Sequence, residues 1–265
     1  MKKMKLLLAG VLCAGIAFGA TACGKKKDKV VIGFTYFAPI AYEDENKKLT
    51  GFDVELAKAV FKEIDKTYGT TTSVEFQEIE WDAKETLLKN GTIDLVWNGL
   101  TITEERQKNM EISIPYLNNE QVCVIKKSDS EKYTGPTSFT DAVCVVESGS
   151  AGEDCANEQK DAGRIKEVTK NDSQLLALNS VKDGNADVAV IDSVMAGYYT
   201  TTSNLKDSLM IVNNLVLATE QYGIAAKKGN SELINKINLA LIAIKDTEFK
   251  TLADAYGLTD YIAVK

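Results

Sequence analysis

Histidine is absent from this chain of 265 residues. Its absence excludes Ser-His-Asp and Cys-His catalysis, and a catalytic zinc site would lack its commonest ligand. Proline is also scarce, with three residues, and no low-complexity segment interrupts the body of the chain. The five cysteines show no metal-ligand spacing. We therefore expect neither a bound metal nor a cofactor.

The N-terminus has the order of a secretory signal. Lys2, Lys3 and Lys5 precede the apolar run Leu6–Ala20, and small residues then lead to Cys23. A charged region, a short apolar region and small residues before a cleavage site are typical of such signals. The run is shorter than the roughly 20 residues of a transmembrane helix. We find no other segment of the sequence that is suited to span a bilayer.

The residues before Cys23 resemble a bacterial lipobox, although Ala20 stands where leucine is usual. The resemblance implies a lipoprotein signal peptide over 1–22, lipid attachment at Cys23 and a lysine-rich tether over 23–29. One acyl chain binds a membrane only marginally, so stable anchoring needs several chains on this cysteine. We expect the mature protein to be anchored on the extracellular face of the cell membrane of a monoderm bacterium. A periplasmic location is the alternative. An ordinary secretory signal with no role for Cys23 is the alternative.

The predicted mature chain is acidic. Three of the 31 Lys and Arg residues lie in the predicted signal, which leaves 28 against 38 Asp and Glu, a balance of about −10. Nucleic-acid binding depends on clustered Lys and Arg, so we expect no nucleic-acid partner. Cys123, Cys144 and Cys155 remain, and an odd count leaves at least one thiol unpaired or intermolecular. Whether Cys144 and Cys155 form a disulfide is open at this stage.

Strand and helix patterns alternate along the chain, which predicts an α/β fold with parallel sheets covered by helices. The predicted strands are Val30–Tyr36, Val74–Ile79, Ile93–Trp97, Gln121–Lys126, Val143–Glu147, Ile165–Val168, Asp187–Ile191 and Tyr222–Ala226. The predicted helices are Asp53–Tyr68 with Asp53 as N-cap, Asp82–Lys89, Gly152–Asp161, Asp172–Asp183, Ser231–Lys245 and Glu248–Tyr256.

The pattern restarts once, which predicts two lobes of similar plan. With crossings at Tyr116–Glu120 and Asn213–Glu220, residues 30–117 and 216–265 would form lobe 1 and residues 118–215 lobe 2. Two crossings form a hinge, and a cleft between lobes is a favoured ligand site. Ligands of open α/β sheets bind at the carboxyl ends of strands.

The most informative segment is Gly91–Arg106. A buried strand leads to a bend at Asn98–Gly99 and then to a helix that begins at Thr103, so Arg106 falls in the first helical turn. A guanidinium beside free backbone N–H groups suits the carboxylate of a small ligand. The alternative is a surface arginine paired with a neighbouring glutamate.

Several motifs stand in the order and spacing of the polar amino-acid-binding proteins of ABC importers. They are Gly51–Lys58, Gly91–Leu95, Thr101–Arg106, Glu147–Glu153, Gly184–Asp192 and Tyr222–Ala225. The resemblance covers nearly all of residues 30–257. It implies the type II periplasmic-binding-protein fold, in which two Rossmann-like lobes joined by a two-segment hinge close around one amino acid.

The resemblance also implies roles by position. Arg106 resembles the arginine that pairs with the α-carboxylate, Thr101 and the backbone at Gly99 resemble its hydrogen-bonding companions, and Ser150 contacts the same group on closure. Asp192 matches the acid that receives the α-ammonium. The aromatic walls are matched by Phe37 and Trp81, and Asn98 and Glu147 complete the candidate ligand-binding set.

Residue types alone leave other roles open. Asp192 precedes the helix that begins at Ser193, and at this position a carboxylate could serve simply as the N-cap of that helix. Phe37 and Trp81 are equally compatible with core packing, and we expect Trp97, inside its strand, to be structural. Lys84 and Glu85 stand where the family usually has aliphatic residues. These charges either face the cleft or are solvated, and we expect them to be solvated.

Related proteins that hold cationic or amide side chains often carry an acid where this chain has Phe34. We therefore expect an amino-acid ligand with a neutral polar or sulfur-containing side chain. The predicted function is a monomeric, lipid-anchored binding protein that delivers this ligand to an ABC permease. The alternative is an enzyme of the same fold, a cyclohexadienyl (prephenate or arogenate) dehydratase, with Glu147 as general acid or base.

Overall fold

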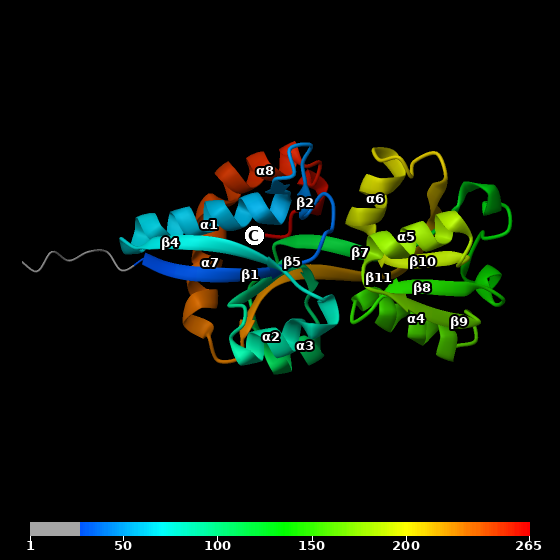
Figure 1. The fold of residues 1–265 in the computed structure, drawn as a ribbon, viewed down its shortest axis with the longest axis horizontal. Coiled ribbons are helices and arrows are strands. Elements are labelled where there is room, and N and C mark those ends of the chain that lie inside the picture. Colours follow the sequence, from blue (N-terminus) through cyan, green and yellow to red (C-terminus); the bar gives the residue numbers. More distant parts are fainter. Residues whose placement is uncertain (1–26) are drawn as a thin grey trace, which may run out of the picture.

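The computed structural model describes residues 27–265. Two lobes lie side by side, and two long strands run through both of them (Figure 1). The predicted signal peptide and Cys23 lie outside the described residues. Within residues 27–265, no helix is long and apolar enough to cross a membrane.

One sheet of nine strands extends through both lobes, and the hairpin β2–β3 stands apart. The strands are β1 (Lys27–Phe34), β2 (Tyr42–Glu43), β3 (Leu49–Thr50), β4 (Thr71–Glu78), β5 (Leu95–Thr101), β6 (Met110–Ile112), β7 (Leu117–Lys126), β8 (Val143–Glu147), β9 (Glu167–Asn171), β10 (Val188–Asp192) and β11 (Leu209–Lys227). The helices are α1 (Phe52–Tyr68), α2 (Lys84–Asn90), α3 (Glu104–Asn109), α4 (Ala151–Asp161), α5 (Gln174–Asp183), α6 (Ser193–Thr201), α7 (Ser231–Ile244) and α8 (Lys250–Ala255).

The strand order is β4-β1-β5-β11-β7-β10-β8-β9, with β6 paired to β11. Strands β4, β1 and β5 are parallel in one lobe, and β10, β8 and β9 are parallel in the other. Between these two groups lie β11 and β7, which are antiparallel to their neighbours. This arrangement confirms the predicted α/β class with two Rossmann-like lobes and a two-segment hinge.

Successive residues of the central strands bury their side chains on opposite faces of the sheet. In β5, Leu95 packs with the apolar cluster that includes α1 and α7, whereas Val96 packs with the cluster that includes Leu88 of α2. In β10, Val190 packs with Ala156 of α4 and Ile191 with Leu178 of α5. Helices therefore cover both faces in both lobes, as the unbroken apolar runs of these strands require.

The hinge consists of β7 and β11, which pair with each other along the crossing, for example Glu220 with Asn119 and Tyr222 with Leu117. The predicted return segment and the predicted final strand are in fact one strand of 19 residues. Its register shifts between Ile211 and Val216 and again between Val216 and Ala218. Which residues belong to which lobe stays a prediction.

Several local predictions differ from the structure; the predicted strand Ile165–Val168, for example, lies at Glu167–Asn171. β1 begins at Lys27, because Lys27–Lys29 pair with Thr71–Ser73, so this part of the predicted tether is strand. The N-cap of α1 is Gly51 rather than Asp53. The strand before Arg106 does not end at Trp97 but continues to Thr101, with the predicted bend taken up at Gly99 inside it.

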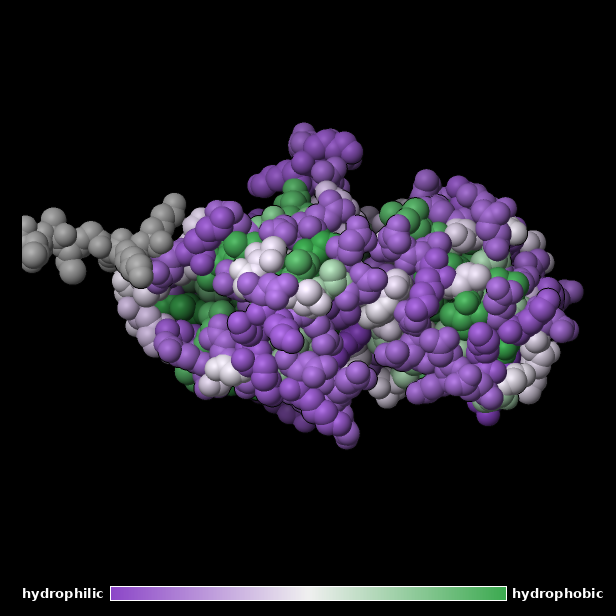
Figure 2. Space-filling model, turned by 60° about the horizontal axis from the view of Figure 1, so that its bottom comes forward, coloured by the Kyte–Doolittle hydropathy of each residue, from purple (hydrophilic) through white to green (hydrophobic). Residues whose placement is uncertain are grey.

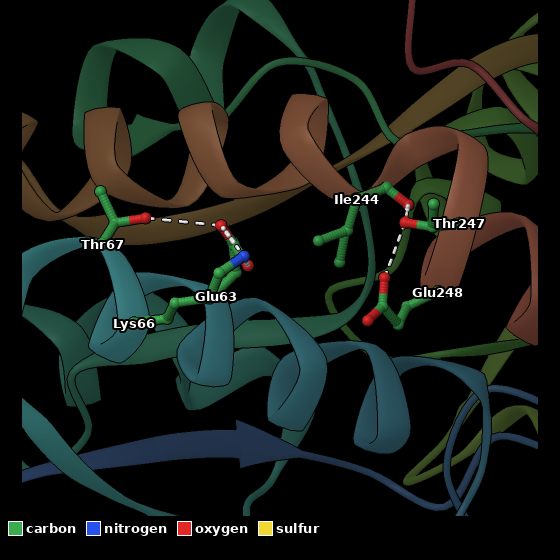
Figure 3. A network of polar contacts seen from close by, with 6 residues as sticks. All are labelled: Glu63, Lys66, Thr67, Ile244, Thr247 and Glu248. Atoms are coloured by element: carbon green, nitrogen blue, oxygen red, sulfur yellow. Dashed lines mark hydrogen bonds and ion pairs between the residues drawn. The ribbon is translucent and has the colours of Figure 1, made fainter.

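Helices α1 and α7 pack through apolar side chains and carry separate polar networks on their surfaces. Figure 3 shows Glu63 of α1 with Lys66 Nζ 2.9 Å away, and Thr247 between Ile244 and Glu248 where α7 passes into the π-helical turn η4 (Lys245–Phe249). Exposed contacts of this kind add little stability. The face shown in Figure 2 is mostly hydrophilic, with hydrophobic residues in separate small areas.

Candidate functional site

A cavity with about 270 Å³ of empty space lies between the lobes. The residues that line it are Thr35, Phe37, Trp81, Asn98, Gly99, Thr101, Arg106, Glu147, Ser150, Ala151, Gln174 and Asp192. All nine residues of the predicted ligand-binding set are among them. The structure thus brings together residues from three segments of one lobe and three of the other, at the carboxyl ends of their strands.

Arg106 lies in the cavity wall because α3 begins immediately after β5. Its backbone N–H is capped by Thr103 Oγ1 at 3.1 Å, and its side chain is buried. The guanidinium donates to the carbonyl oxygens of Thr101 at 2.9 Å and of Gly149 at 3.2 Å. None of the ion pairs of the described residues includes Arg106, so the alternative of a surface arginine paired with a glutamate is not observed. Its fork keeps the capacity to bind a carboxylate.

The N-terminus of α4 faces the same end of the cavity. Ser150 is its N-cap and accepts from the N–H of Glu153 at 3.0 Å, and its hydroxyl donates to the carbonyl of Glu147 at 2.8 Å. The first N–H groups of a helix have no partner within it and favour an anion. Gly152 lets α4 approach closely, because a Cβ there would lie 2.7 Å from the carbonyl oxygen of Val190. With Arg106, this helix end forms a site for a carboxylate.

Asp192, the last residue of β10, also lines the cavity. It occupies the N-cap position of α6 but makes no side-chain capping bond, so it is not merely a cap. Its carboxyl group accepts from the side chains of Asn119, Gln121, Tyr222 and Gln174. Burial, and next the neighbouring carboxyl of Glu220, raise the pKa of Asp192 well above its usual range. An arriving ammonium group would supply the counter-charge that this buried acid lacks.

Aromatic and amide side chains line the remaining volume. Phe37 and Trp81 are both almost fully buried in this wall. Asn98 donates to Thr35 Oγ1 at 3.0 Å, while its Oδ1 is buried without a hydrogen-bond partner. Glu147 is also buried, which raises its pKa to about 7 despite the opposing charges of Lys84 and Arg106. A ligand side chain that donates a hydrogen bond would satisfy the free oxygen of Asn98.

The glycine in the bend is required by its neighbours. Gly99 has φ +65°, and a Cβ there would lie 2.7 Å from Phe37 Cε1. Its N–H donates to the carboxyl of Asp53 at 3.0 Å, and the hydroxyl of Tyr116 donates to the same oxygen at 2.7 Å. Asp53, predicted as a helix cap, instead stabilises the bend by accepting the hydrogen bond from the N–H of Gly99. Trp97 lies in the core, as expected, and does not line the cavity.

Comparisons with known proteins agree with this geometry. Residues 30–259 match the model of the bacterial extracellular solute-binding proteins, family 3. The chain belongs to this family. Its curated relatives include the arginine-binding extracellular protein ArtP of Bacillus subtilis (strain 168), which is 30% identical over 258 residues, 93% of this chain and 94% of ArtP.

Two solved structures have a similar fold, and both are amino-acid-binding proteins or their relatives. A substrate-binding protein of an ABC uptake transporter from Streptococcus pneumoniae with bound histidine superposes with a TM-score of 0.78 at 31% identity, covering 89% of this chain and 95% of that one. An ancestral amino acid-binding protein described as a precursor of cyclohexadienyl dehydratase superposes with a TM-score of 0.75 at 29% identity, covering 86% and 95%. The family's proteins are the solute-binding components of importers, and the relatives bind amino acids.

In this solute-binding protein the two lobes also touch directly beside the cavity. Lys84 Nζ donates to the carbonyl oxygen of Gly149 at 2.9 Å, the same oxygen that Arg106 contacts across the cleft. The expectation that Lys84 is solvated is wrong, since its side chain is buried beside the Trp81 ring, and burial lowers its pKa to about 8. Glu85 is only partly exposed and accepts from Asn109 at 3.2 Å.

The sequence reasoning missed a group of polar residues around Asp192. They are Asn119 and Gln121 of β7, Gln174 of α5, and Glu220 and Tyr222 of β11. A signal was present, because polar residues at every second position of a strand share one face. Asn119 with Gln121, and Glu220 with Tyr222, show this spacing in the two hinge strands.

The cysteines of the described residues are all free thiols, so the disulfide between Cys144 and Cys155 is not formed. Burial raises the pKa of Cys123 and of Cys155 to about 12. Thiols with such pKa values remain protonated at neutral pH and react slowly. Among residues 27–265, no cluster of acids or cysteines is arranged to hold a metal ion.

Proposed function

We propose that this protein captures an amino acid between its two lobes and delivers it to an ABC permease. The observation that carries the proposal is that Arg106 and Asp192 are both buried and both line the one cavity between the lobes. A zwitterion presents a carboxylate and an ammonium, and burial of its charges is favourable only where each meets a partner. The family membership supports the transport role, and the proposal extends to lipid attachment at Cys23 and extracellular localisation.

We further propose that the ligand side chain is neutral and polar, within the predicted class of neutral polar or sulfur-containing side chains. Phe34 packs with Ala41 and Val54 and does not line the cavity, so position 34 supplies no acid to a cationic side chain. The unpartnered Oδ1 of Asn98 favours a side chain with an N–H or O–H donor.

A thermal-shift screen tests the ligand class. We expect a neutral polar amino acid to raise the melting temperature most among the twenty common amino acids, cystine and ornithine. A ligand at 100 times its Kd adds about 2.7 kcal/mol to the stability of the native state, which is a readily measured shift. Arginine or lysine as the strongest stabiliser would contradict the proposed side chain. No shift with any amino acid would contradict the proposed function.

Contact between the lobes beside the cavity gives a second prediction. Gly149 has φ +71°, and a Cβ there would lie 2.9 Å from the Cα of Asp82 in the other lobe. Gly149→Ala should therefore disfavour closure by the cost of overpacking, about 1–3 kcal/mol, which is a loss of roughly fivefold to a hundredfold in affinity by calorimetry.

Gly163→Ala is the matched control for this substitution. Gly163 has φ +70°, but a Cβ added there would meet no atom within 4 Å, so alanine at this position carries the backbone cost alone. We expect it to lower the melting temperature and leave affinity unchanged. Wild-type affinity in Gly149→Ala, or equal loss in both variants, would show that the Gly149 contact does not support closure.

The enzymatic alternative has one observation in its favour, the buried Glu147, whose pKa of about 7 suits a general acid. Its test is loss of CO₂ and water from prephenate or arogenate by the purified protein, with Glu147→Gln as the inactive control. Absence of turnover, together with amino-acid binding, would exclude the dehydratase.

A further inference from the structure

Two carboxyl groups lie close together behind the ammonium end of the cavity. Asn119 Nδ2 lies 2.5 Å from Asp192 Oδ1 and 2.6 Å from Glu220 Oε1. Gln121 Nε2 lies 3.0 Å and 2.9 Å from the same two oxygens. An amide NH₂ group has two hydrogens, so each amide can serve both acids. The two acids therefore share the same two donors.

The hydrogen-bond partners of this acid pair are neutral. Besides the shared amides, Glu220 accepts from Thr101 Oγ1 at 3.0 Å and Asp192 from the hydroxyl of Tyr222 at 2.8 Å. Two carboxylates in contact cannot both ionise cheaply, so such a pair retains a proton at a pH where a single acid would lose it. The raised pKa of Asp192 agrees with this geometry.

Other titratable groups face the pair from the surrounding elements. Arg106 of α3 is the cation among them, and its charge favours ionisation of both acids. Tyr116 before β7 and Tyr222 of β11 face Asp192, and Cys155 of α4 faces both acids. Burial keeps the two tyrosines and Cys155 protonated at neutral pH, so their charge does not change where the carboxyls titrate.

We propose that the ligand-free site holds one proton on Asp192 beside the carboxyl group of Glu220, and that the ligand's ammonium group replaces it. This inference rests on the proposed function. The proton leaves to water, Asp192 becomes ionised, and the ammonium takes over the balancing positive charge beside it. Glu220 is then a positioning residue that acts through Asp192 and Thr101 and couples amino-acid binding to proton release.

The departing proton has a route that does not pass through the ligand. Glu220 also lines a groove on the hinge strands, together with Asn118, Glu120, Thr219 and Asp260. This groove encloses about 1030 Å³ and is open to solvent. The proton released by Asp192 can therefore reach water along this groove, beside Glu220, while the lobes remain closed on the ligand.

Calorimetry at several pH values tests the coupling, with L-glutamine as titrant and the strongest binder of the thermal-shift screen as second titrant. Because the ligand-free site holds the proton and the bound site does not, affinity should increase with pH, up to about tenfold per unit, until the pair is ionised without ligand. Titrations in buffers of different ionisation enthalpy should show release of close to one proton. In Glu220→Gln, which keeps the size of the side chain, the release and the pH slope should both fall sharply.

Two control variants separate this pair from other acids. Burial raises the pKa of Glu147 to about 7, so proton release by Glu147→Gln, measured at whatever affinity that variant retains, excludes Glu147 as the source of the proton. Asp260→Asn removes a groove acid outside the pair and should release it too. Amino-acid binding by the wild type without proton release, or equal release by wild type and Glu220→Gln, would overturn the coupling alone. Failure of every amino acid to bind would overturn the proposed function and the coupling with it.

Discussion

Arg106→Ala is expected to abolish micromolar amino-acid binding. Removal of one partner of a buried, hydrogen-bonded charge pair costs about 2–5 kcal/mol, or roughly 30-fold to several thousandfold in Kd. The buried guanidinium has no carboxylate partner among the described residues, so the ligand's carboxylate is its expected counter-ion. Calorimetry with the strongest ligand of the thermal-shift screen measures the loss.

The control for Arg106→Ala is Arg164→Ala, because Arg164 is an exposed arginine of the other lobe whose guanidinium donates to the side chain of Gln159 at 3.1 Å. It should bind like the wild type. A ligand analogue without the carboxylate adds a second control. This analogue should bind the wild type weakly, and its affinity should fall little further in Arg106→Ala. The variant and the analogue each remove the same interaction, that of Arg106 with the ligand's carboxylate. Retained micromolar affinity for the complete amino acid would show that its carboxylate is held elsewhere.

Asp192→Asn should weaken binding by a similar factor through the opposite pole of the ligand. The asparagine keeps the shape of the side chain and can still accept from Tyr222, but it offers no charge to the ammonium group. The buried carboxylate is costly in the ligand-free protein, so we expect the variant to stay folded, with little change in melting temperature. Calorimetry and thermal unfolding of the same samples measure the two effects separately.

The α-hydroxy acid that corresponds to the ligand identifies the role of Asp192 directly. This analogue has no ammonium group, so it should bind the wild type poorly. Its affinity should not fall further in Asp192→Asn. The exposed Asp183 of α5 provides the control, because Asp183→Asn removes a charge from the same lobe outside the cavity. Wild-type affinity of Asp192→Asn for the amino acid would show that Asp192 does not bind the ligand's ammonium group.

The fold could be predicted because its strands and helices are strongly patterned. The apolar runs at Val188–Ile191 and Leu95–Trp97 are buried on both faces, and only a sheet between helices satisfies them. The predictions failed where a residue suited a local interaction, such as helix capping, but makes a tertiary contact instead. Asp53 stands where an N-cap is common, yet its carboxyl instead lies under Gly99.

The candidate site could be predicted only in part, for a similar reason. Asp192 ends β10 and Arg106 lies in the first turn of the helix after β5, so the edge rule for α/β sheets places them. Glu220 and Asn119 are 101 residues apart in sequence, and only the register of β11 against β7 brings their side chains together. Lys84 was misjudged because a lysine in a surface helix is usually solvated, whereas here a carbonyl of the opposite lobe receives it.

The paired crossing strands restrict how this protein can move. β7 and β11 are hydrogen-bonded to each other and, at their ends, to the sheets of both lobes. Because the two strands are paired, we expect any opening of the lobes to twist both strands together. Two spin labels, one in each lobe, should consequently report a distance that alternates between two values, with the ligand altering how often each occurs rather than creating intermediate ones.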